Sequence, residues 1–375
     1  MTECSSASLI PIFDGHNDTI LDLAASGRSF YERSNTGHLD RVRAAEGGLV
    51  GGFFAVFVPN LDSDKESSRR IVESIGHGLD GVPLMNGSGP TLAYAQQFTI
   101  AAIAKLLRIE AGEGAPVSRD ERLGVEMPTD PLSFIQSAAE LEENIESGEF
   151  SAILHMEGAE AIDEHLHALE TFHAAGVRSL GIVWSRSNIF GHGVPFEYPS
   201  SPDTGPGLTD LGLGLVDGCN ELGILIDLSH LNEKGFWDVA ERTTAPLVTT
   251  HSNAHAICPA SRNLTDKQLD AIADSDGIVG VNFNCGFLRP DGARDADTPL
   301  ETMADHVDYL VERIGIERVA LGSDFDGALM PNDLSDASKL PNLIAVLRAR
   351  GYDDDALNRI GTRNWLRVLE ATRGF

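Results

Sequence analysis

Cysteine, long apolar runs and basic residues are all scarce in this sequence, and each scarcity excludes a class of protein. The four cysteines form no CxxC pair, which argues against both a disulfide framework and a cysteine zinc site. No stretch approaches the roughly 18 consecutive apolar residues of a membrane-spanning helix. The first residues also lack the basic and apolar regions of a secretory signal. We therefore expect a cytoplasmic protein without a membrane partner.

Acidic residues outnumber basic ones by 57 to 28, which gives a formal net charge of −29 at pH 7. A chain this acidic repels phosphate backbones and anionic lipid surfaces, so we expect no nucleic-acid partner. The 375 residues, 42% of them hydrophobic, suffice to bury a large core. Because α/β barrels reach this length as single units, we expect one domain over residues 1–375.

Eight short apolar runs recur along the chain, and segments with helical periodicity separate them. Strands that alternate with helices predict a parallel sheet, and eight such units favour a closed (β/α)8 TIM barrel of the α/β class. No GxGxxG follows an early strand, which argues against a nucleotide-binding sheet. The runs are LIPIFDGH (9–16), LVGGFFAVFV (49–58), SAILHMEG (151–158), VRSLGIVW (177–184), GILIDLSH (223–230), PLVTTHS (246–252), GIVGVNF (277–283) and RVALGSDF (318–325).

Two segments are too long to be simple connections. About residues 60–148 separate the second and third predicted strands. This segment contains helical patterns over 93–112 and 130–148, so we predict a helical insertion there. Residues 185–207, after the fourth strand, are rich in Gly, Pro and Ser and predict a long loop that covers the site.

Side chains that bind metal ions fall at the carboxyl ends of the predicted strands, where barrel active sites assemble. His16 and Asp18 are two residues apart, so in an extended segment both leave the same face and can converge on one ion. Glu157 can give one oxygen to each of two ions, and His230 with His251 would complete the second ion. Three ligands per ion leave open positions, which is typical of catalytic zinc.

Zinc is the metal that this ligand set predicts, because it accepts imidazole and carboxylate where cysteine is absent, although manganese or iron fits a similar site. Two ions about 3.5–4 Å apart can hold a bridging water, lower its pKa from about 15.7 toward about 7 and polarise a scissile carbonyl. Asp324 is then the natural general base. The alternative for Asp324 is a helix N-cap, a part that Asp326 could equally play.

His155 has two interpretations. It shares a strand face with Glu157 and could be a ligand in place of His16 or beside it. We favour a histidine of the barrel interior, just below the metal ions and hydrogen-bonded to a neighbour.

Six motifs resemble, in order and approximate spacing, those of the renal (membrane) dipeptidase family of dinuclear zinc metallopeptidases. The resemblance covers all eight predicted strands, and NWLRVL (364–369) is similar to the C-terminal helix of that family. It implies an amidohydrolase-like barrel that cleaves small dipeptides of L,L or L,D configuration and forms a homodimer. The motifs are DGHND (14–18), HMEG (155–158), DLSH (227–230), THS (250–252), SRN (261–263) and GSDFDG (322–327).

Carried over residue by residue, the resemblance implies His16 and Asp18 on one Zn2+, and His230 with His251 on the other. Glu157 and a water or hydroxide would bridge the two ions.

The same resemblance implies roles for two further residues. Asp324 would shuttle the proton between the water and the leaving amine. Arg262 would hold the terminal carboxylate of the substrate, which a guanidinium can grip through two hydrogen bonds. A solvated surface arginine is the alternative for Arg262 without the surrounding motif.

The chain departs from the family at two positions. Ser185 stands after the fourth strand where relatives commonly have a histidine, so Arg186 or His192 is predicted to supply the missing donor to the oxyanion. Asn284 stands after the seventh strand where relatives often have tyrosine, and we predict that it affects substrate preference.

Two other functions compete with a metallo-dipeptidase. A dinuclear zinc amidohydrolase acting on N-acyl amino acids, lactones or cyclic amides would use the same nucleophile. A non-catalytic metal-binding scaffold is disfavoured, because it has no need for Asp324.

Overall fold

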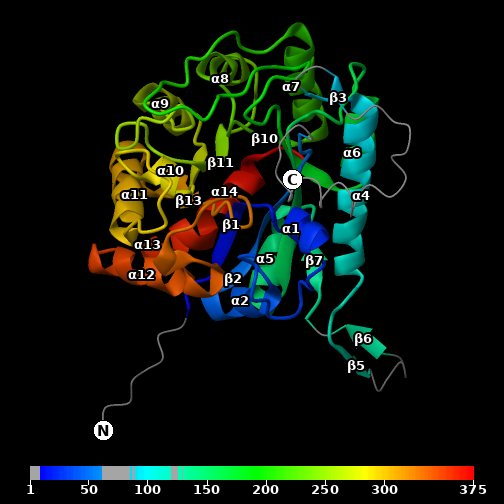
Figure 1. The fold of residues 1–375 in the computed structure, drawn as a ribbon, viewed down its shortest axis with the longest axis vertical. Helices are drawn as coiled ribbons and strands as arrows, with labels where there is room; N and C mark the ends of the chain where they lie inside the picture. Colours follow the sequence, from blue (N-terminus) through cyan, green and yellow to red (C-terminus); the bar gives the residue numbers. More distant parts are fainter. Residues whose placement is uncertain (1–8, 61–84, 87–88, 120–125, 129) are drawn as a thin grey trace.

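A parallel barrel of eight strands forms the centre of the protein (Figure 1). The structure is a computed structural model, and it describes residues 9–60, 85–86, 89–119, 126–128 and 130–375. The strands neighbour one another in chain order. A bridge between Asn17 and Phe325 joins the last strand to the first. The eight predicted strands and the (β/α)8 barrel are therefore confirmed. The strands are β1 (Ile12–Asn17), β2 (Leu49–Phe57), β8 (Phe150–Glu157), β9 (Val177–Gly181), β10 (Leu225–Asp227), β11 (Val248–Ser252), β12 (Ile278–Val281) and β13 (Val319–Leu321).

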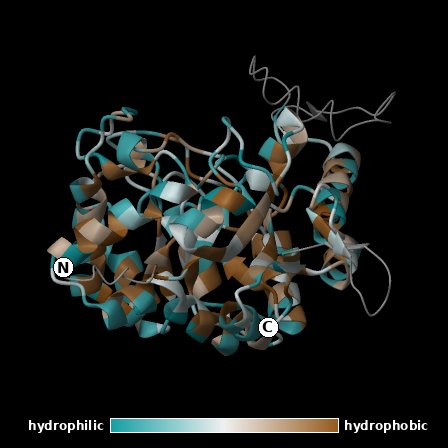
Figure 2. Ribbon diagram, turned by 90° about the horizontal axis from the view of Figure 1, so that it is seen from below, coloured by the Kyte–Doolittle hydropathy of each residue, from teal (hydrophilic) through white to brown (hydrophobic). Residues whose placement is uncertain are grey.

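Successive side chains of each strand face the barrel interior and the surrounding helices in turn. On β2, Phe53 belongs to the interior cluster, whereas Phe54 packs in the layer between strands and helices. Trp365 fills the interior against Phe53, with ring centroids 5.1 Å apart, and donates its indole N–H to Leu321 O at 3.2 Å. Figure 2 shows the resulting concentration of hydrophobic residues along the central strands.

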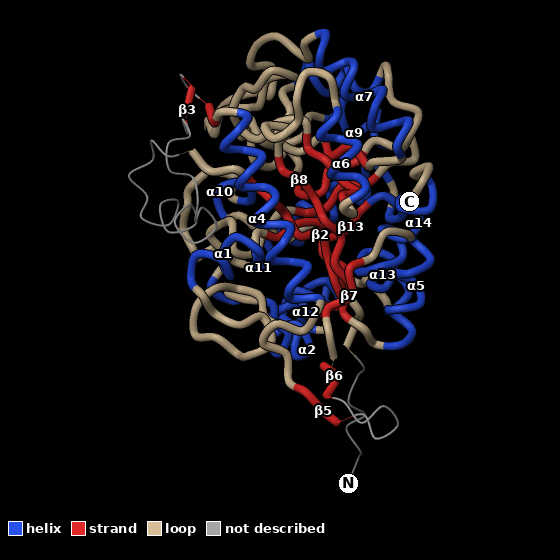
Figure 3. The backbone as a smooth tube through the Cα atoms, turned by 90° about the vertical axis from the view of Figure 1, so that its right-hand side faces the viewer, coloured by secondary structure: helices blue, strands red, loops and turns tan. Residues whose placement is uncertain are grey.

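Helices surround the strands, as Figure 3 shows. Their ends follow local signals in the sequence: Ser137 and Glu140, for example, form a capping box at the start of α5. The helices are α1 (Thr19–Ser26), α2 (Arg41–Gly47), α4 (Leu92–Glu110), α5 (Ala138–Ser147), α6 (His167–Ala174), α7 (Asp210–Leu222), α8 (Glu233–Ala240), α9 (Asp266–Asp274), α10 (Cys285–Leu288), α11 (Leu300–Ile314), α12 (Leu340–Ala349), α13 (Asp354–Asn358) and α14 (Asn364–Ala371).

The predicted insertion between the second and third barrel strands contains helices α4 and α5 but also short strands. Two of these, β5 (Val117–Arg119) and β6 (Glu126–Pro128), form an antiparallel pair, as do β3 (Met85–Asn86) and β4 (Gly89–Pro90). Residues 61–84, 87–88, 120–125 and 129 of the insertion lie outside the described residues.

The prediction of helix over 130–148 is wrong at its start, because Leu132–Phe134 form strand β7, which pairs with residues 150–152 of β8. The pairing of β8 with β9 begins only at Leu154, so this edge of β8 is free to accept a partner.

The predicted loop over residues 185–207 contains no helix or strand. It returns to the barrel where the Val194 N–H donates to His230 O at 2.8 Å, and the Ser200 N–H donates to Pro259 O at 2.9 Å. The loop therefore lies beside the carboxyl end of the fifth barrel strand, β10.

Candidate metal centre and active site

All six predicted metal-site and catalytic side chains lie in or within three residues of the carboxyl ends of their strands. Glu157 is the last residue of β8, and Asp18 follows the end of β1. His230 and Asp324 each stand three residues after their strands, β10 and β13. His251 lies within β11, next to its final residue. His16, the sixth, is the penultimate residue of β1.

Three imidazoles converge on one carboxylate oxygen. Glu157 Oε1 lies 2.9 Å from His230 Nε2, 3.5 Å from His16 Nε2 and 3.6 Å from His251 Nε2. The same His16 Nε2 also lies 3.7 Å from Asp18 Oδ2. The structure thus brings the five predicted metal ligands together around Glu157, and Asp324 lies in one cluster with His16 and Asp18.

A buried hydrogen-bond chain sets the tautomer of His251. The Thr250 hydroxyl donates to Asp227 Oδ2 at 2.6 Å, so its oxygen accepts from His251 Nδ1 at 2.8 Å. The proton of neutral His251 is then on Nδ1, and the Nε2 lone pair faces Glu157. Carboxylates and hydroxyls behind a histidine commonly orient metal ligands in this way.

Ser185 supports His230 in a corresponding way. Its Oγ lies 2.8 Å from His230 Nδ1 and can accept the ring N–H, which leaves the Nε2 lone pair of His230 toward Glu157. The residue that replaces the family histidine after the fourth strand therefore contacts a predicted metal ligand directly.

The ligand set fits a divalent cation. Both ring nitrogens of His16 are buried and have no hydrogen-bond partner among the described residues. Nε2 of His230 and Nε2 of His251 lie only 3.1 Å apart. Because the proton of His251 is on Nδ1, its Nε2 presents a lone pair to His230. Lone pairs that converge in a buried space are stabilised by a cation between them.

Burial shifts the titration of these groups away from their ordinary ranges. It raises the pKa of Asp18 to about 7, with the charge of Asp326 adding to the shift. It raises the pKa of Glu157 well above its usual value and lowers the pKa of His16 to about 4. Burial also raises the pKa of Asp324 to about 6, against the effect of nearby His16. Positive charge from a bound cation would favour the ionised carboxylates.

Backbone strain marks the same site. His230 and Asp324 have φ values of 67° and 62°, a left-handed conformation that non-glycine residues rarely adopt. Asp324 is fixed by its N–H, which donates to His16 O at 2.9 Å, and by its Oδ2, which accepts from Asn282 Nδ2 at 3.0 Å. Gly327 packs against both acids: a Cβ there would lie 2.0 Å from Asp18 Oδ2 and 2.6 Å from Asp324 Oδ1.

Arg262 is buried beside the centre rather than solvated at the surface. Its Nη1 donates to Ser252 Oγ and its Nη2 to His251 O, each at 2.9 Å. Its Nε is buried without a partner within the described part of the chain. The guanidinium therefore brings a positive charge and an unused donor next to the metal ligands.

The other predicted substrate contacts have partners within the protein. Arg186 pairs through Nε with Glu160 Oε1 at 2.8 Å, and its Nη2 donates to Val58 O. His192 Nδ1 lies 2.8 Å from a serine hydroxyl. Asn284 caps α10 by accepting the Gly286 N–H at 3.0 Å. Roles for Arg186, His192 and Asn284 in substrate binding stay predictions.

His155 lies where the preferred interpretation placed it. Its Nδ1 is 2.9 Å from Ser179 Oγ, and its Nε2 is 3.6 Å from Asp227 Oδ2. His16, His155 and Asp227 also lie close enough to hold an ion, but Asp227 already accepts three hydrogen bonds from Thr250 and Ser229.

No role was predicted for Asp227, Thr250 or Asn282, which contact predicted site residues directly or, for Asp227, through Thr250. The first two belong to the DLSH and THS motifs, and that adjacency to His230 and His251 was the only available signal. Asn282 stands at the end of a strand without a neighbouring metal-type residue, so only the structure identifies it.

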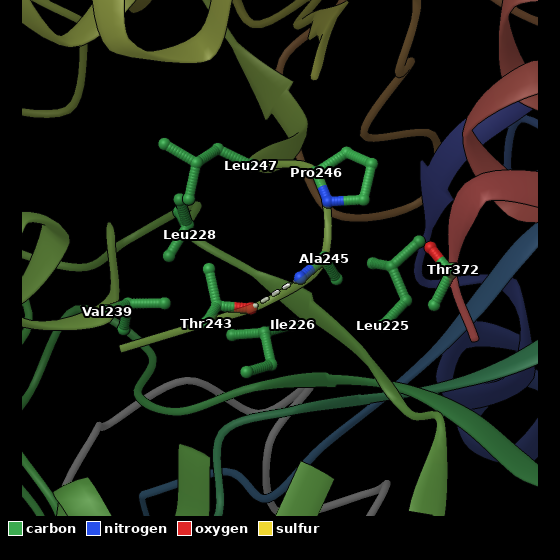
Figure 4. A pocket seen from close by; sticks show the side chains of 9 residues that line it. All are labelled: Leu225, Ile226, Leu228, Val239, Thr243, Ala245, Pro246, Leu247 and Thr372. Carbon is green, nitrogen blue, oxygen red and sulfur yellow. Dashed lines mark hydrogen bonds between the residues drawn. The ribbon is translucent and has the colours of Figure 1, made fainter. Parts of the chain in front are cut away.

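An apolar hollow at the amino ends of β10 and β11 is separate from this centre (Figure 4). Its lining includes Leu225, Val239, Leu247 and Thr372, and it leaves no room for a water molecule. The hollow contains none of the predicted site residues, so we assign it to packing.

Comparison with known proteins gives consistent matches. Residues 122–374 match the model of the membrane dipeptidase family, peptidase family M19. A metallo peptidase from Rhodobacter sphaeroides, solved with a phosphinate mimic of the dipeptide L-Ala-D-Ala, is 44% identical, with a TM-score of 0.84 over 97% of this chain and 100% of that one. An uncharacterized Klebsiella pneumoniae protein from the pqqA 5′ region is 54% identical over 64% of this chain and 88% of its own. Dipeptidase tcpJ from Claviceps purpurea is 27% identical over 95% of this chain and 76% of its own.

Among the described residues, no helix is both long enough and apolar enough to cross a lipid bilayer. The cytoplasmic location and the homodimer stay predictions.

Proposed function

Because the chain belongs to the membrane dipeptidase family, peptidase family M19, we propose that it hydrolyses the peptide bond of free dipeptides, of L,L or L,D configuration, with two zinc ions. The observation that carries this proposal is the convergence of three imidazole Nε2 atoms on Glu157 Oε1, next to the buried Arg262. The relative from Rhodobacter sphaeroides supports a dipeptide as substrate.

His16 and Asp18 would hold one zinc ion, His230 with His251 would hold the other, and Glu157 would contribute to both. When bound, the zinc ions supply Lewis-acid polarisation of the scissile carbonyl and a water of lowered pKa as nucleophile. Thr250 and Ser185 keep the two histidines of the second ion in the tautomer that binds a metal.

Asp324 moves the proton in this proposal. It accepts a proton from the attacking water and returns it to the leaving amine nitrogen. Asn282 occupies its Oδ2, which leaves Oδ1 as the accepting atom. The Gly327 N–H donates to Asp324 O at 3.1 Å, and the absence of a side chain at Gly327 leaves room for the carboxylates of Asp18 and Asp324.

Arg262 anchors the C-terminal residue of the substrate. Ser252 and the backbone of His251 anchor its guanidinium beside a proposed metal ligand. A terminal carboxylate bound there places the peptide bond of the last residue at the ions, so a dipeptide fits and an amidated one loses its main anchor.

The test is release of free amino acids from L,L- and L,D-dipeptides by zinc-loaded protein, beside matching N-acetylated peptides. We expect Asp324→Asn to lower kcat by about 10²- to 10⁴-fold with unchanged zinc content. Asp333→Asn, at an exposed position, is the matched control and keeps wild-type activity.

Two results would contradict the proposal. Equal turnover of N-acetylated compounds would assign the chain to the amidohydrolases that act on N-acyl amino acids. No turnover with two zinc ions bound would make it a scaffold.

A further inference from the structure

Four partly exposed aromatic side chains form a continuous arc on the carboxyl-end face of the barrel. Phe57 and Trp184 have ring centroids 4.7 Å apart, Trp184 and Phe196 5.3 Å, and Phe196 and Phe287 5.8 Å. We call Phe57, Trp184, Phe196 and Phe287 the aromatic arc. They come from the end of β2, the segment after β9, the 185–207 loop and α10, so only the tertiary structure assembles them.

The aromatic arc adjoins the metal centre at two points. The rings of Trp184 and Phe196 lie 5.9 and 6.1 Å from the ring of His230. At the far end, Arg262 Cζ lies 6.0 Å from the Phe287 ring centroid. The arc therefore extends from beside a proposed zinc ligand to the proposed carboxylate anchor.

The aromatic arc offers apolar surface and little charge. The Phe196 side chain is 52% exposed. Arg186 lies 4.9 Å from the Phe57 ring, but its charge is paired with Glu160. An aromatic surface beside a few convergent polar groups is typical of a small-molecule binding site.

We propose that the aromatic arc binds the side chain of the substrate's C-terminal residue, with Phe196 as a specificity-determining residue. This inference rests on the proposed dipeptidase function. The carboxylate bound by Arg262 belongs to that C-terminal residue, so the side chain on the same Cα begins next to Phe287 and can extend along the arc toward Phe196. The substrate class is a dipeptide whose C-terminal residue is large and apolar or aromatic.

The experiment measures kcat/KM for Ala-Gly, Ala-Ala, Ala-Leu and Ala-Phe, with both configurations of the chiral C-terminal residue, and for the reversed dipeptide Phe-Ala. We expect the wild type to prefer Ala-Phe over Ala-Gly by about 10- to 200-fold, the range that apolar contacts provide. Phe196→Ala should lose about tenfold on Ala-Phe, mostly through KM, and stay within about twofold of wild type on Ala-Gly.

Two further variants separate recognition from folding. Phe196→Leu keeps apolar contact and should restore most of the preference. Ile189→Ala removes another half-exposed apolar side chain of the same loop, 50% exposed, and should leave every ratio unchanged.

Three results would overturn the inference. Wild type could hydrolyse dipeptides without preferring a large C-terminal side chain. Phe196→Ala could affect Phe-Ala instead of Ala-Phe, or slow all dipeptides equally. Failure of every dipeptide to react would overturn the proposed function and this inference together, whereas reaction without the preference overturns the inference alone.

Discussion

Replacing Thr250 with valine removes a hydroxyl that two buried residues of the metal centre share. The hydroxyl donates to the Asp227 carboxylate at 2.6 Å and accepts from His251 Nδ1 at 2.8 Å. A hydrogen bond to a charged group contributes about 1.5–3 kcal/mol, and a buried N–H without an acceptor costs about 1–3 kcal/mol. Valine keeps the shape of the side chain, so no cavity adds to these terms. We expect Thr250→Val to lower the free energy of unfolding of the zinc-free protein by about 3 kcal/mol.

Thr249→Val is the matched control on the same strand. Thr249 is fully buried, but its hydroxyl has no hydrogen-bond partner within the described residues. Its removal should leave the free energy of unfolding unchanged or raise it by about 1 kcal/mol. Urea unfolding of chelator-treated protein measures both variants.

Zinc affinity gives a second readout. Loss of a group that orients a metal-binding histidine commonly costs about 10- to 100-fold in affinity, so Thr250→Val should bind zinc more weakly in competition with a chelator, and Thr249→Val should not. Equal unfolding midpoints and equal zinc affinities of the two variants would refute the proposed role of the Thr250 hydroxyl.

Three further perturbations test other parts of the structure. Burial lowers the pKa of His306 to about 4, partly offset by its hydrogen bond to Leu288 O, so the folded state stays neutral while the unfolded chain takes up a proton below about pH 6.5. The protein should therefore lose about 3 kcal/mol of stability between about pH 6.5 and 4 from this group, and unfolding curves of His306→Gln should show a smaller loss over that range. Gly327→Ala places a methyl group 2.0 Å from Asp18 Oδ2, so we expect the zinc content and kcat/KM to fall together. An unchanged zinc content of the variant would contradict this expectation. Trp365→Ala leaves a cavity in the barrel interior and should lower the free energy of unfolding, measured in urea, by about 3–5 kcal/mol without changing substrate preference.

The barrel was predictable because its signal is local. Each strand is a short apolar run, each connection has helical periodicity, and parallel strands require crossovers. The strand Leu132–Phe134 was not predicted because it depends on a partner that its own sequence does not show. That partner is the edge of β8 over residues 150–152, which β9 leaves unpaired.

The sequence by itself determined which residues meet at the centre. His16, Glu157 and His251 lie at or near strand ends, and a parallel barrel brings all such ends to one face, so linear position was enough to predict their proximity.

Only the tertiary structure decided how the surrounding side chains are used. The sequence predicts that Arg186 can donate to the oxyanion of the substrate. In the structure its guanidinium pairs with Glu160, 26 residues earlier in the chain. In the sequence, Ser185 stands only as a departure from the histidine that relatives commonly have at this position. In the structure its hydroxyl lies 2.8 Å from His230 Nδ1. The aromatic arc joins four separate segments. These side chains belong to loops and strand ends. There the direction of a side chain depends on the packing of neighbouring segments, because its own segment has no regular periodicity.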